Sequence, residues 1–265
     1  MPSKLQLTLV FALLVCRLGA QFPTKLQPRT VEEFDAYART VEKELSTRWQ
    51  GYKPFLAIEN NPADLAKVLA GDLLIEPGVP DNPISISNGL IHDWVGAEFI
   101  PNAGMQKVLR ILQDFNRHSQ IYPEIISSRL LRQNANTFTG YWRLERKDPV
   151  LPVVLDVEQD ARYEEVGPGK WVCRAYAKNI SEVEKPGTPQ EKKLPPGEGN
   201  GFLWRLDAYW ALESRNNGVL TECRTLSLSR GIPVALTWAI KPFIQKLPRE
   251  SLASTLRNTR SAAAK

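Results

Sequence analysis

The sequence contains few of the residues that carry metal, redox and nucleophilic chemistry. Its 265 residues include only two histidines, His92 and His118, and three cysteines, and no set of them has metal-ligand spacing. The phosphate and dinucleotide glycine loops and the Gly-x-Ser-x-Gly, His-Glu-x-x-His and Ser-x-x-Lys motifs are absent as well. The sequence therefore predicts no catalytic residue, no metal site and no cofactor.

The scarce residues that do occur are predicted to be structural. His92 and Asp93 are adjacent on a predicted strand, where successive side chains point to opposite faces, so they should not act as a catalytic pair. His118 is expected to end a helix, where a cation suits the helix dipole. Cys173 and Cys223 lie on strands with a third strand between them, about 9.6 Å apart, whereas a disulfide needs Cα atoms within about 7 Å. We expect two buried free thiols.

Long apolar runs are also missing, apart from a short one near the N-terminus. Lys4 precedes residues 5–15 (LQLTLVFALLV), and Ala20 offers a small residue before Gln21. This arrangement is typical of an export signal, and the run is shorter than the roughly 20 residues of a membrane span. We predict that residues 1–20 are a cleaved signal peptide and that the protein is exported to the bacterial periplasm or cell envelope. An uncleaved anchor is the alternative.

Positive charge is concentrated at the C-terminal end. The chain carries a formal charge of +5, and the segment from Gly231 onward holds six basic residues against Glu250 alone. These cations would complement the dipole of a C-terminal helix, or would make a peripheral contact with an anionic membrane. Basic stripes interleaved with exposed aromatic residues are absent, so we expect no nucleic-acid partner.

Residues 21–82 are predicted to be a helical N-terminal extension. Residues 30–48 repeat apolar side chains at helical spacing, with Thr30 and Glu33 as a capping box. A second short helix is expected over 62–70, with Asn61 as its cap. The extension should pack on the main domain or be tethered to it by the Pro/Gly connector at 76–83.

Residues 83–265 are predicted to form one α+β domain. Strands alternate with short connections, which favours antiparallel pairing of sequential strands. The expected fold is a curved antiparallel sheet of about six or seven strands wrapped around a long C-terminal helix, in which Pro242 and Pro248 should cause a kink or a break. The expected strands are 84–100, 125–133, 137–147, 150–166, 170–183, 201–216 and 218–230, and a helix is expected over 104–118.

Aromatic residues are the main indication of a binding site. Trp204, Leu206 and Trp210 alternate onto one face of a strand, and the next strand presents small, mildly polar residues on its matching face. Large side chains beside small ones leave room for a mostly apolar pocket, although a fully packed aromatic core is the alternative. The predicted ligand-binding residues are Trp142, Leu144, Trp204, Leu206, Trp210, Cys223, Thr225, Leu236, Ile240 and Phe243.

The element order resembles the START/SRPBCC superfamily, the helix-grip fold of birch-pollen-allergen-like proteins. Four stretches (91–103, 120–131, 201–213 and 227–252) resemble uncharacterised exported bacterial members, and the resemblance covers roughly 84–262. It implies a hydrophobic or amphipathic, lipid-like ligand held in a cavity between the sheet and the C-terminal helix, without catalysis.

Two other functions stay open. A cyclase/aromatase-like or hydrolase-like enzyme would need acid–base groups in the same cavity, and the titratable candidates are Tyr141, Asp156, Asp207 and Tyr209. Asp207 and Tyr209 fall on the predicted outer face, which disfavours this function. A structural envelope protein with a vestigial cavity is the third possibility, and would show a packed core with an exposed apolar patch.

Overall fold

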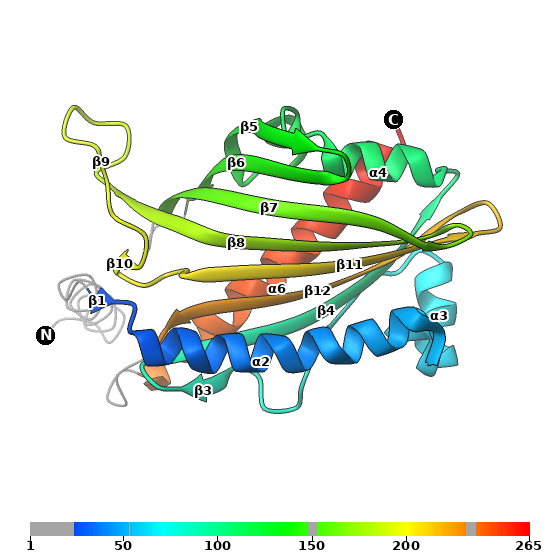
Figure 1. The fold of residues 1–265 in the computed structure, drawn as a ribbon, viewed down its shortest axis with the longest axis horizontal. Coiled ribbons are helices and arrows are strands. Elements are labelled where there is room, and N and C mark those ends of the chain that lie inside the picture. Colours follow the sequence, from blue (N-terminus) through cyan, green and yellow to red (C-terminus); the bar gives the residue numbers. More distant parts are fainter. Residues whose placement is uncertain (1–23, 53, 148–152, 232–236) are drawn as a thin grey trace, which may run out of the picture.

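The computed structural model describes residues 24–52, 54–147, 153–231 and 237–265, without the side chains of residues 52 and 237–245. It forms three layers. A large antiparallel sheet lies in the middle, helix α2 (Pro28–Thr47) covers one face, and α6 (Thr237–Ala263) crosses the other (Figure 1). We call the face toward α6 the inner face and the face toward α2 the outer face. The predicted α+β helix-grip architecture is therefore confirmed.

The sheet has ten strands, eight of them in the order β2-β4-β12-β11-β8-β7-β6-β5, with β3 beside β4 and β9 beside β8. A separate two-stranded pair joins β1 (Thr24–Lys25) to β10 (Glu198–Gly199). The prediction of six or seven strands missed the short strands. The remaining bounds are β2 Leu74–Pro77, β3 Ile84–Ile86, β4 Gly89–Pro101, β5 Ile125–Asn134, β6 Thr137–Arg146, β7 Val153–Gly167, β8 Lys170–Glu184, β9 Lys192–Lys193, β11 Arg205–Arg215 and β12 Gly218–Arg230.

The order of the strands confirms the prediction for the cysteines. Trp210 of β11 lies opposite Cys173 on β8 and Cys223 on β12, so a complete strand separates the two thiols. Both are free and buried. The same register shows that Trp210, Cys173 and Cys223 share the inner face, because directly paired residues project to the same side of a sheet.

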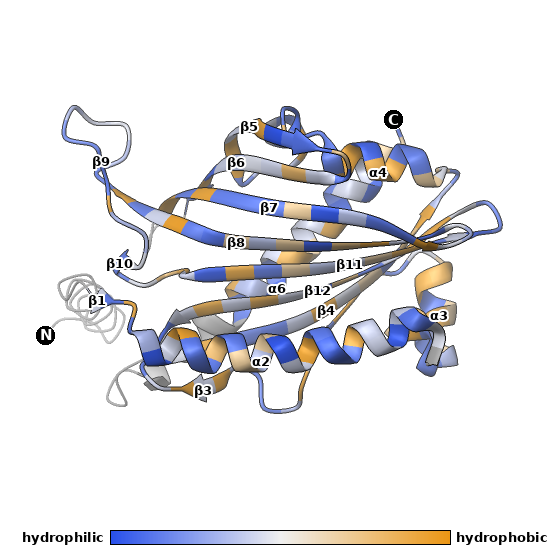
Figure 2. Ribbon diagram, viewed as in Figure 1, coloured by the Kyte–Doolittle hydropathy of each residue, from blue (hydrophilic) through white to orange (hydrophobic). Residues whose placement is uncertain are grey.

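The N-terminal extension completes the outer core. Its remaining elements are η1 (Arg48–Tyr52), η2 (Ala57–Asn60) and α3 (Pro62–Leu69). Figure 2 shows hydrophobic residues recurring along α2, and the buried ones pack in one cluster with the outer face of the sheet. The buried residues of α2 are Thr30, Phe34, Ala38, Val41 and Leu45. The alternative in which the extension is merely tethered is thus wrong for residues 28–47.

The capping predictions for the extension were half right. Asn61 caps α3 by accepting a hydrogen bond from the backbone N–H of Asp64. However, α2 begins at Pro28, two residues earlier than predicted, so Thr30 and Glu33 lie inside the helix. Thr30 Oγ1 donates to the carbonyl of Ser87, and Glu33 accepts from the backbone and hydroxyl of Ser87. These residues fasten α2 to the β3–β4 turn instead of capping it.

On the inner face, α4 (Met105–Gln113), α5 (His118–Ile121) and the C-terminal half of α6 close one end of the core. The methyl groups of Leu252 and Leu256 occupy the space where Gly96 has no side chain, since a Cβ there would lie 2.5 Å from Leu256 Cδ1. The predicted break of the terminal helix is wrong, because α6 runs as one helix through both prolines. Burial of Leu252 and Leu256 favours this continuity, as tertiary packing outweighs intrinsic propensity.

Candidate functional site

Alanine side chains form the centre of the inner face. Ala161 of β7, Ala175 of β8 and Ala208 of β11 lie opposite one another in the register, and Ala177 follows on β8. All four are buried. Their methyl groups occupy little of the space between the sheet and α6, so larger side chains or a ligand must fill the rest.

Half-buried apolar residues border this alanine floor. Trp142 and Leu144 of β6 and Leu206 of β11 pack against a small buried cluster that includes Val157 and Ile180. The side chains of Trp142, Leu144 and Leu206 keep part of their surface accessible, unlike the residues under α4. The inner face therefore has a closed end beneath α4 and a more accessible end around Leu144 and Leu206.

The other predicted site residues take different positions. Trp210 and Cys223 are 7% and 1% exposed and belong to the closed core. Thr225 is half-buried on the inner face, opposite Trp94. Leu236 lies outside the described residues. The backbones of Ile240 and Phe243 belong to α6, and their side chains lie outside the described residues.

Among the predicted site residues whose side chains the structure describes, Trp204 is the one that lies elsewhere. It packs in the outer cluster with Tyr209 and Leu228, and it is 4% exposed. The strand β11 begins only at Arg205, so the alternation that fixes Leu206 and Trp210 does not extend to residue 204. The assignment of Trp204 to the same face as Trp210 is therefore corrected.

Two side chains of β4, the buried His92 and the half-buried Trp94, place buried ring nitrogens on the inner face. His92 Nε2 lies 3.0 Å from Ser229 Oγ, whereas His92 Nδ1 has no hydrogen-bond partner among the described residues. Burial lowers the pKa of His92 to about 4, so the ring is neutral near pH 7. Trp94 Nε1 is also buried without a partner among these residues. Both groups could serve a ligand, because an unsatisfied buried polar group costs about 1–3 kcal/mol.

Glu98, four residues after Trp94 on β4, is the residue that the sequence analysis missed. It is 0% exposed, and neither carboxyl oxygen has a hydrogen-bond partner among the described residues. Arg260 Nε of α6 lies 3.6 Å from Oε2. Burial raises the pKa of Glu98 to about 8, against the opposing effect of Arg260 and Arg257. Its position could have been found, since residues 92, 94, 96 and 98 alternate onto one face.

His118 is buried, contrary to the prediction of a charged residue at a helix end. It begins α5 and lies among the rings of Phe115, Tyr122 and Trp142. Trp142 Nε1 donates to its Nδ1 at 3.0 Å, and Nε2 lies 3.2 Å from the carbonyl of Ile111. Burial lowers the pKa of His118 to about 4. Both ring nitrogens have partners, so His118 has a structural role.

The four catalytic candidates all lie on the outer face. Tyr141 donates to Asp156 Oδ1 at 2.8 Å, and Arg143 forms an ion pair with the same carboxylate. Asp207 and Tyr209 lie beneath α2, where burial, followed by the nearby α2 carboxylates, raises the pKa of Asp207 to about 7. The structure thus brings Tyr141 together with Asp156, but places neither pair in the space between the sheet and α6.

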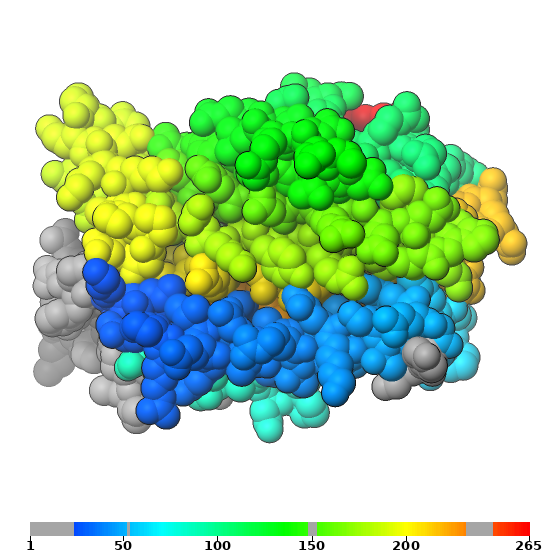
Figure 3. All heavy atoms as spheres, in the orientation of Figure 1, coloured from blue at the N-terminus to red at the C-terminus, as the bar shows by residue number. Residues whose placement is uncertain are grey.

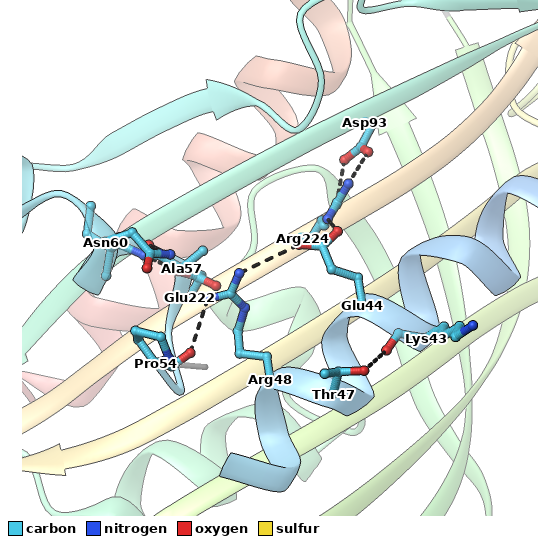
Figure 4. A network of polar contacts seen from close by, with 11 residues as sticks. Lys43, Glu44, Thr47, Arg48, Pro54, Ala57, Asn60, Asp93, Glu222 and Arg224 are labelled. Carbon is cyan, nitrogen blue, oxygen red and sulfur yellow. Dashed lines mark hydrogen bonds and ion pairs between the residues drawn. The ribbon is translucent and has the colours of Figure 1, made fainter. Parts of the chain in front are cut away.

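A polar network fastens α2 to the outer face (Figure 4). Asp93 is completely buried and accepts from Arg224 Nε at 2.9 Å and from Tyr37 at 2.6 Å. Arg224 also pairs with Glu44, which in turn lies 3.6 Å from Arg48. His92 and Asp93 project to opposite faces as predicted, because Asp93 serves this network and His92 faces inward.

Two surface grooves are the other places in the described part of the chain where a ligand could lie. One open groove of about 510 Å³ lies over Glu158, Asn179 and Lys193, and another of about 590 Å³ lies between β1 and the start of β4. Groups of three or more His, Cys, Asp or Glu residues that could hold a metal ion do not occur in the described residues. None of the helices described here is long and apolar enough to span a membrane.

Comparison with known proteins gives likenesses of fold. No protein-family model and no curated protein matches the sequence. The chain is similar to a STAR-related lipid transfer protein from Xanthomonas axonopodis, with 20% identity and a TM-score of 0.47 over 69% of this chain and 97% of that one. It is similar to human STARD10, with 10% identity and a TM-score of 0.45 over 80% and 82%. A di-domain ARO/CYC, StfQ of the steffimycin biosynthetic pathway, matches with 11% identity and a TM-score of 0.43 over 66% and 51%. All three TM-scores lie below 0.5, and the highest sequence identity is 20%.

Proposed function

We propose that this protein is an exported carrier or sensor that binds a hydrophobic or amphipathic, lipid-like small molecule without catalysis. The ligand would lie between α6 and the inner face of the sheet. One observation carries the proposal: accessible apolar side chains at Leu144 and Leu206 share the inner face with two buried, unpartnered polar groups, His92 Nδ1 and Trp94 Nε1. Ligand sites of soluble proteins combine such an apolar lining with a few polar groups.

The two unpartnered groups favour a ligand with a polar end. The indole N–H of Trp94 can only donate, and neutral His92 presents one nitrogen besides the one near Ser229. A hydroxyl group could satisfy either of them, and a carbonyl oxygen could accept from Trp94 Nε1, while an alkyl or aromatic body would lie over the apolar lining. A pure hydrocarbon would leave both groups unsatisfied.

Binding without reaction is favoured over catalysis by the placement of the titratable groups. Tyr141, Asp156, Asp207 and Tyr209 lie on the outer face, where a ligand beneath α6 cannot reach them. His92, with a pKa lowered to about 4 by burial, is a weak base near pH 7. Glu98 is the one inner-face carboxyl group described above, and it lies at the closed end beside Arg260, away from Leu144 and Leu206.

Native mass spectrometry of protein purified from cells without detergent tests the proposal. We expect an added mass that organic extraction removes and that identifies the ligand class. A bare mass, together with no binding to a panel of fatty acids, sterols, phospholipids and aromatic polyketides, would contradict the carrier function. It would leave the structural envelope protein as the better account.

A variant localises the ligand. Leu206→Asp places a carboxylate on the accessible end of the inner face, and Leu69→Asp places one at a 40% exposed position on α3 as the matched control. We expect Leu206→Asp to lower ligand occupancy at least tenfold, because desolvating a carboxylate against an apolar ligand costs more than about 1.4 kcal/mol. Full occupancy in a folded Leu206→Asp protein would place the ligand elsewhere.

Export is part of the proposal and has its own test. Residues 1–20 would be removed before Gln21, and the mature protein would reside in the periplasm or cell envelope. The intact mass of the protein recovered from the envelope fraction distinguishes a Gln21 start from a retained anchor. Recovery of the full-length chain in the cytoplasmic fraction would refute export.

A further inference from the structure

The β5 strand is the last strand on one side of the sheet and carries two exposed apolar residues. Ile126 is 48% exposed and Leu131 is 44% exposed. Among the described residues, Leu69 is the one other large apolar side chain with comparable exposure. Solvent exposure of two such residues on one ten-residue strand needs an explanation, since soluble proteins usually keep sheet edges polar.

Both residues are displaced from the strand pairing by bulges. The register with β6 shifts between Ile125 and Ser127 and again between Leu130 and Arg132, so Ile126 and Leu131 are the extra, unpaired residues. A β-bulge leaves its extra residue out of the ladder and bends the strand. Two bulges that each release an apolar side chain make Ile126 and Leu131 protrude from the edge.

Arginines flank the two protruding residues. Within residues 105–134 the exposed charged side chains are Arg110, Arg117, Arg129 and Arg132, whereas the acidic Asp114 and Glu124 are half-buried. No ion pair in the described structure engages any of the four arginines. Arg129 lies 4.3 Å above the ring of Tyr141, which keeps it beside the edge. We call Ile126, Leu131, Arg129 and Arg132 the β5 edge surface. Figure 3 shows the green segment that contains β5 on the side of the molecule away from the blue α2.

The backbone hydrogen bonding of β5 disfavours the addition of another strand at this edge. Bulges interrupt the regular row of donors and acceptors that strand addition requires. In addition, Asn116 Oδ1 accepts from the backbone N–H of Leu130, and Ser128 Oγ accepts from the backbone N–H of Ser119. The loop after α4 and the first turn of α5 therefore already occupy part of this edge.

We infer that the β5 edge surface docks on an anionic lipid bilayer, with Ile126 and Leu131 in the headgroup region and the arginines on lipid phosphates. Apolar side chains flanked by unpaired cations match the chemistry of a negatively charged membrane surface. The sequence pointed to the basic C-terminal helix for such a contact. In the structure, however, Arg260 of that helix faces Glu98 and Lys246 pairs with Glu250. The inference does not depend on the proposed ligand.

Vesicle co-sedimentation of the purified protein tests the docking surface. The probes are vesicles of phosphatidylglycerol and phosphatidylcholine in equal parts, and of phosphatidylcholine alone. All proteins share the same N-terminus, so any membrane affinity of residues 1–20 cancels between variants. We expect binding to the anionic vesicles only, with an affinity that falls as salt is added.

The test variants are Ile126→Ser/Leu131→Ser and Arg129→Gln/Arg132→Gln. The first should lower the partition coefficient at least tenfold, from the loss of two inserted apolar side chains. The second should lower it about 25-fold, at roughly fivefold for each arginine removed from an anionic surface. The thermal unfolding temperature of both variants should match that of the unchanged protein, because the four replaced side chains are exposed to solvent.

Matched controls make the same chemical changes elsewhere. Leu69→Ser removes an exposed leucine from α3, and Arg39→Gln/Arg162→Gln removes two exposed arginines from α2 and β7; both should bind like the unchanged protein. Equal binding by the β5 variants and the unchanged protein overturns the inference. A loss of vesicle binding confined to Arg249→Gln/Arg257→Gln in α6 would also overturn it. A change of oligomeric state in the Ile126→Ser/Leu131→Ser protein would overturn it as well, because it would identify a second copy of the chain as the partner of this surface.

Discussion

Replacement of Glu98 by glutamine should change how the stability of the protein depends on pH. Burial raises the pKa of Glu98 to about 8 in the folded protein, from an ordinary value of 4.5. The folded state therefore binds a proton more tightly than the unfolded state. The contribution of the protonated Glu98 to the free energy of unfolding is complete below about pH 4.5, and it is lost progressively as the pH rises through about 8.

The size of this loss follows from the shift in pKa. Each unit corresponds to about 1.4 kcal/mol, so the free energy of unfolding should fall by roughly 4–5 kcal/mol between about pH 4.5 and about pH 8. This is a large part of the roughly 5–15 kcal/mol that stabilises a typical domain. Arg260 Nε, at 3.6 Å, is too distant for a hydrogen bond and does not remove the cost of burying the carboxylate.

Urea denaturation across this pH range measures the effect. Glu98→Gln keeps the shape of the protonated acid, so its stability should nearly match that of the unchanged protein near pH 5 and exceed it by several kcal/mol near pH 8. Asp207, whose pKa burial raises to about 7, adds a similar slope in both proteins and cancels in the difference. A difference between the two proteins that does not vary with pH would refute the reasoning, because it would mean that Glu98 is ionised throughout and paired with Arg260.

Three further substitutions test the packing and the polar contacts. Gly140→Ala should lower the free energy of unfolding by about 1–3 kcal/mol, because its Cβ would lie 1.8 Å from Phe115 Cδ1; an unchanged urea midpoint would contradict the tight contact. Arg224→Met should cost about 3–5 kcal/mol by leaving the carboxylate of Asp93 buried without its cation, and a double-mutant cycle with Asp93→Asn should recover part of that loss. Between about pH 6.5 and about pH 4, the free energy of unfolding should fall by up to roughly 3 kcal/mol less in His118→Gln than in the unchanged protein, because the neutral imidazole of His118 takes up a proton when the protein unfolds. Identical acid transitions of the two proteins by circular dichroism would show that His118 is charged in the fold.

Local periodicity was sufficient to predict most of the framework. Alternation along residues 205–215 and 218–230 predicted two paired strands, and the spacing of Cys173 and Cys223 predicted a strand between them. Asn61 before Pro62 predicted the start of a helix. These features depend on neighbouring residues, whose side-chain directions follow from the backbone repeat. The inward positions of Trp142, Leu144 and Leu206 follow in the same way.

The tertiary structure alone decided which distant segment covers each face. The sequence gives α2 an apolar stripe, but not the outer face that the stripe occupies or the use of Thr30 and Glu33 to hold the turn at Ser87. Trp204 packs in the outer core because β11 starts at Arg205, four residues later than predicted, so that the alternation does not include residue 204. Burial of His118 and Glu98 likewise depends on helices that meet them from other parts of the chain. A periodic pattern determines the direction of a side chain, whereas its burial, protonation and partners depend on contacts between residues far apart in sequence, which no local repeat encodes.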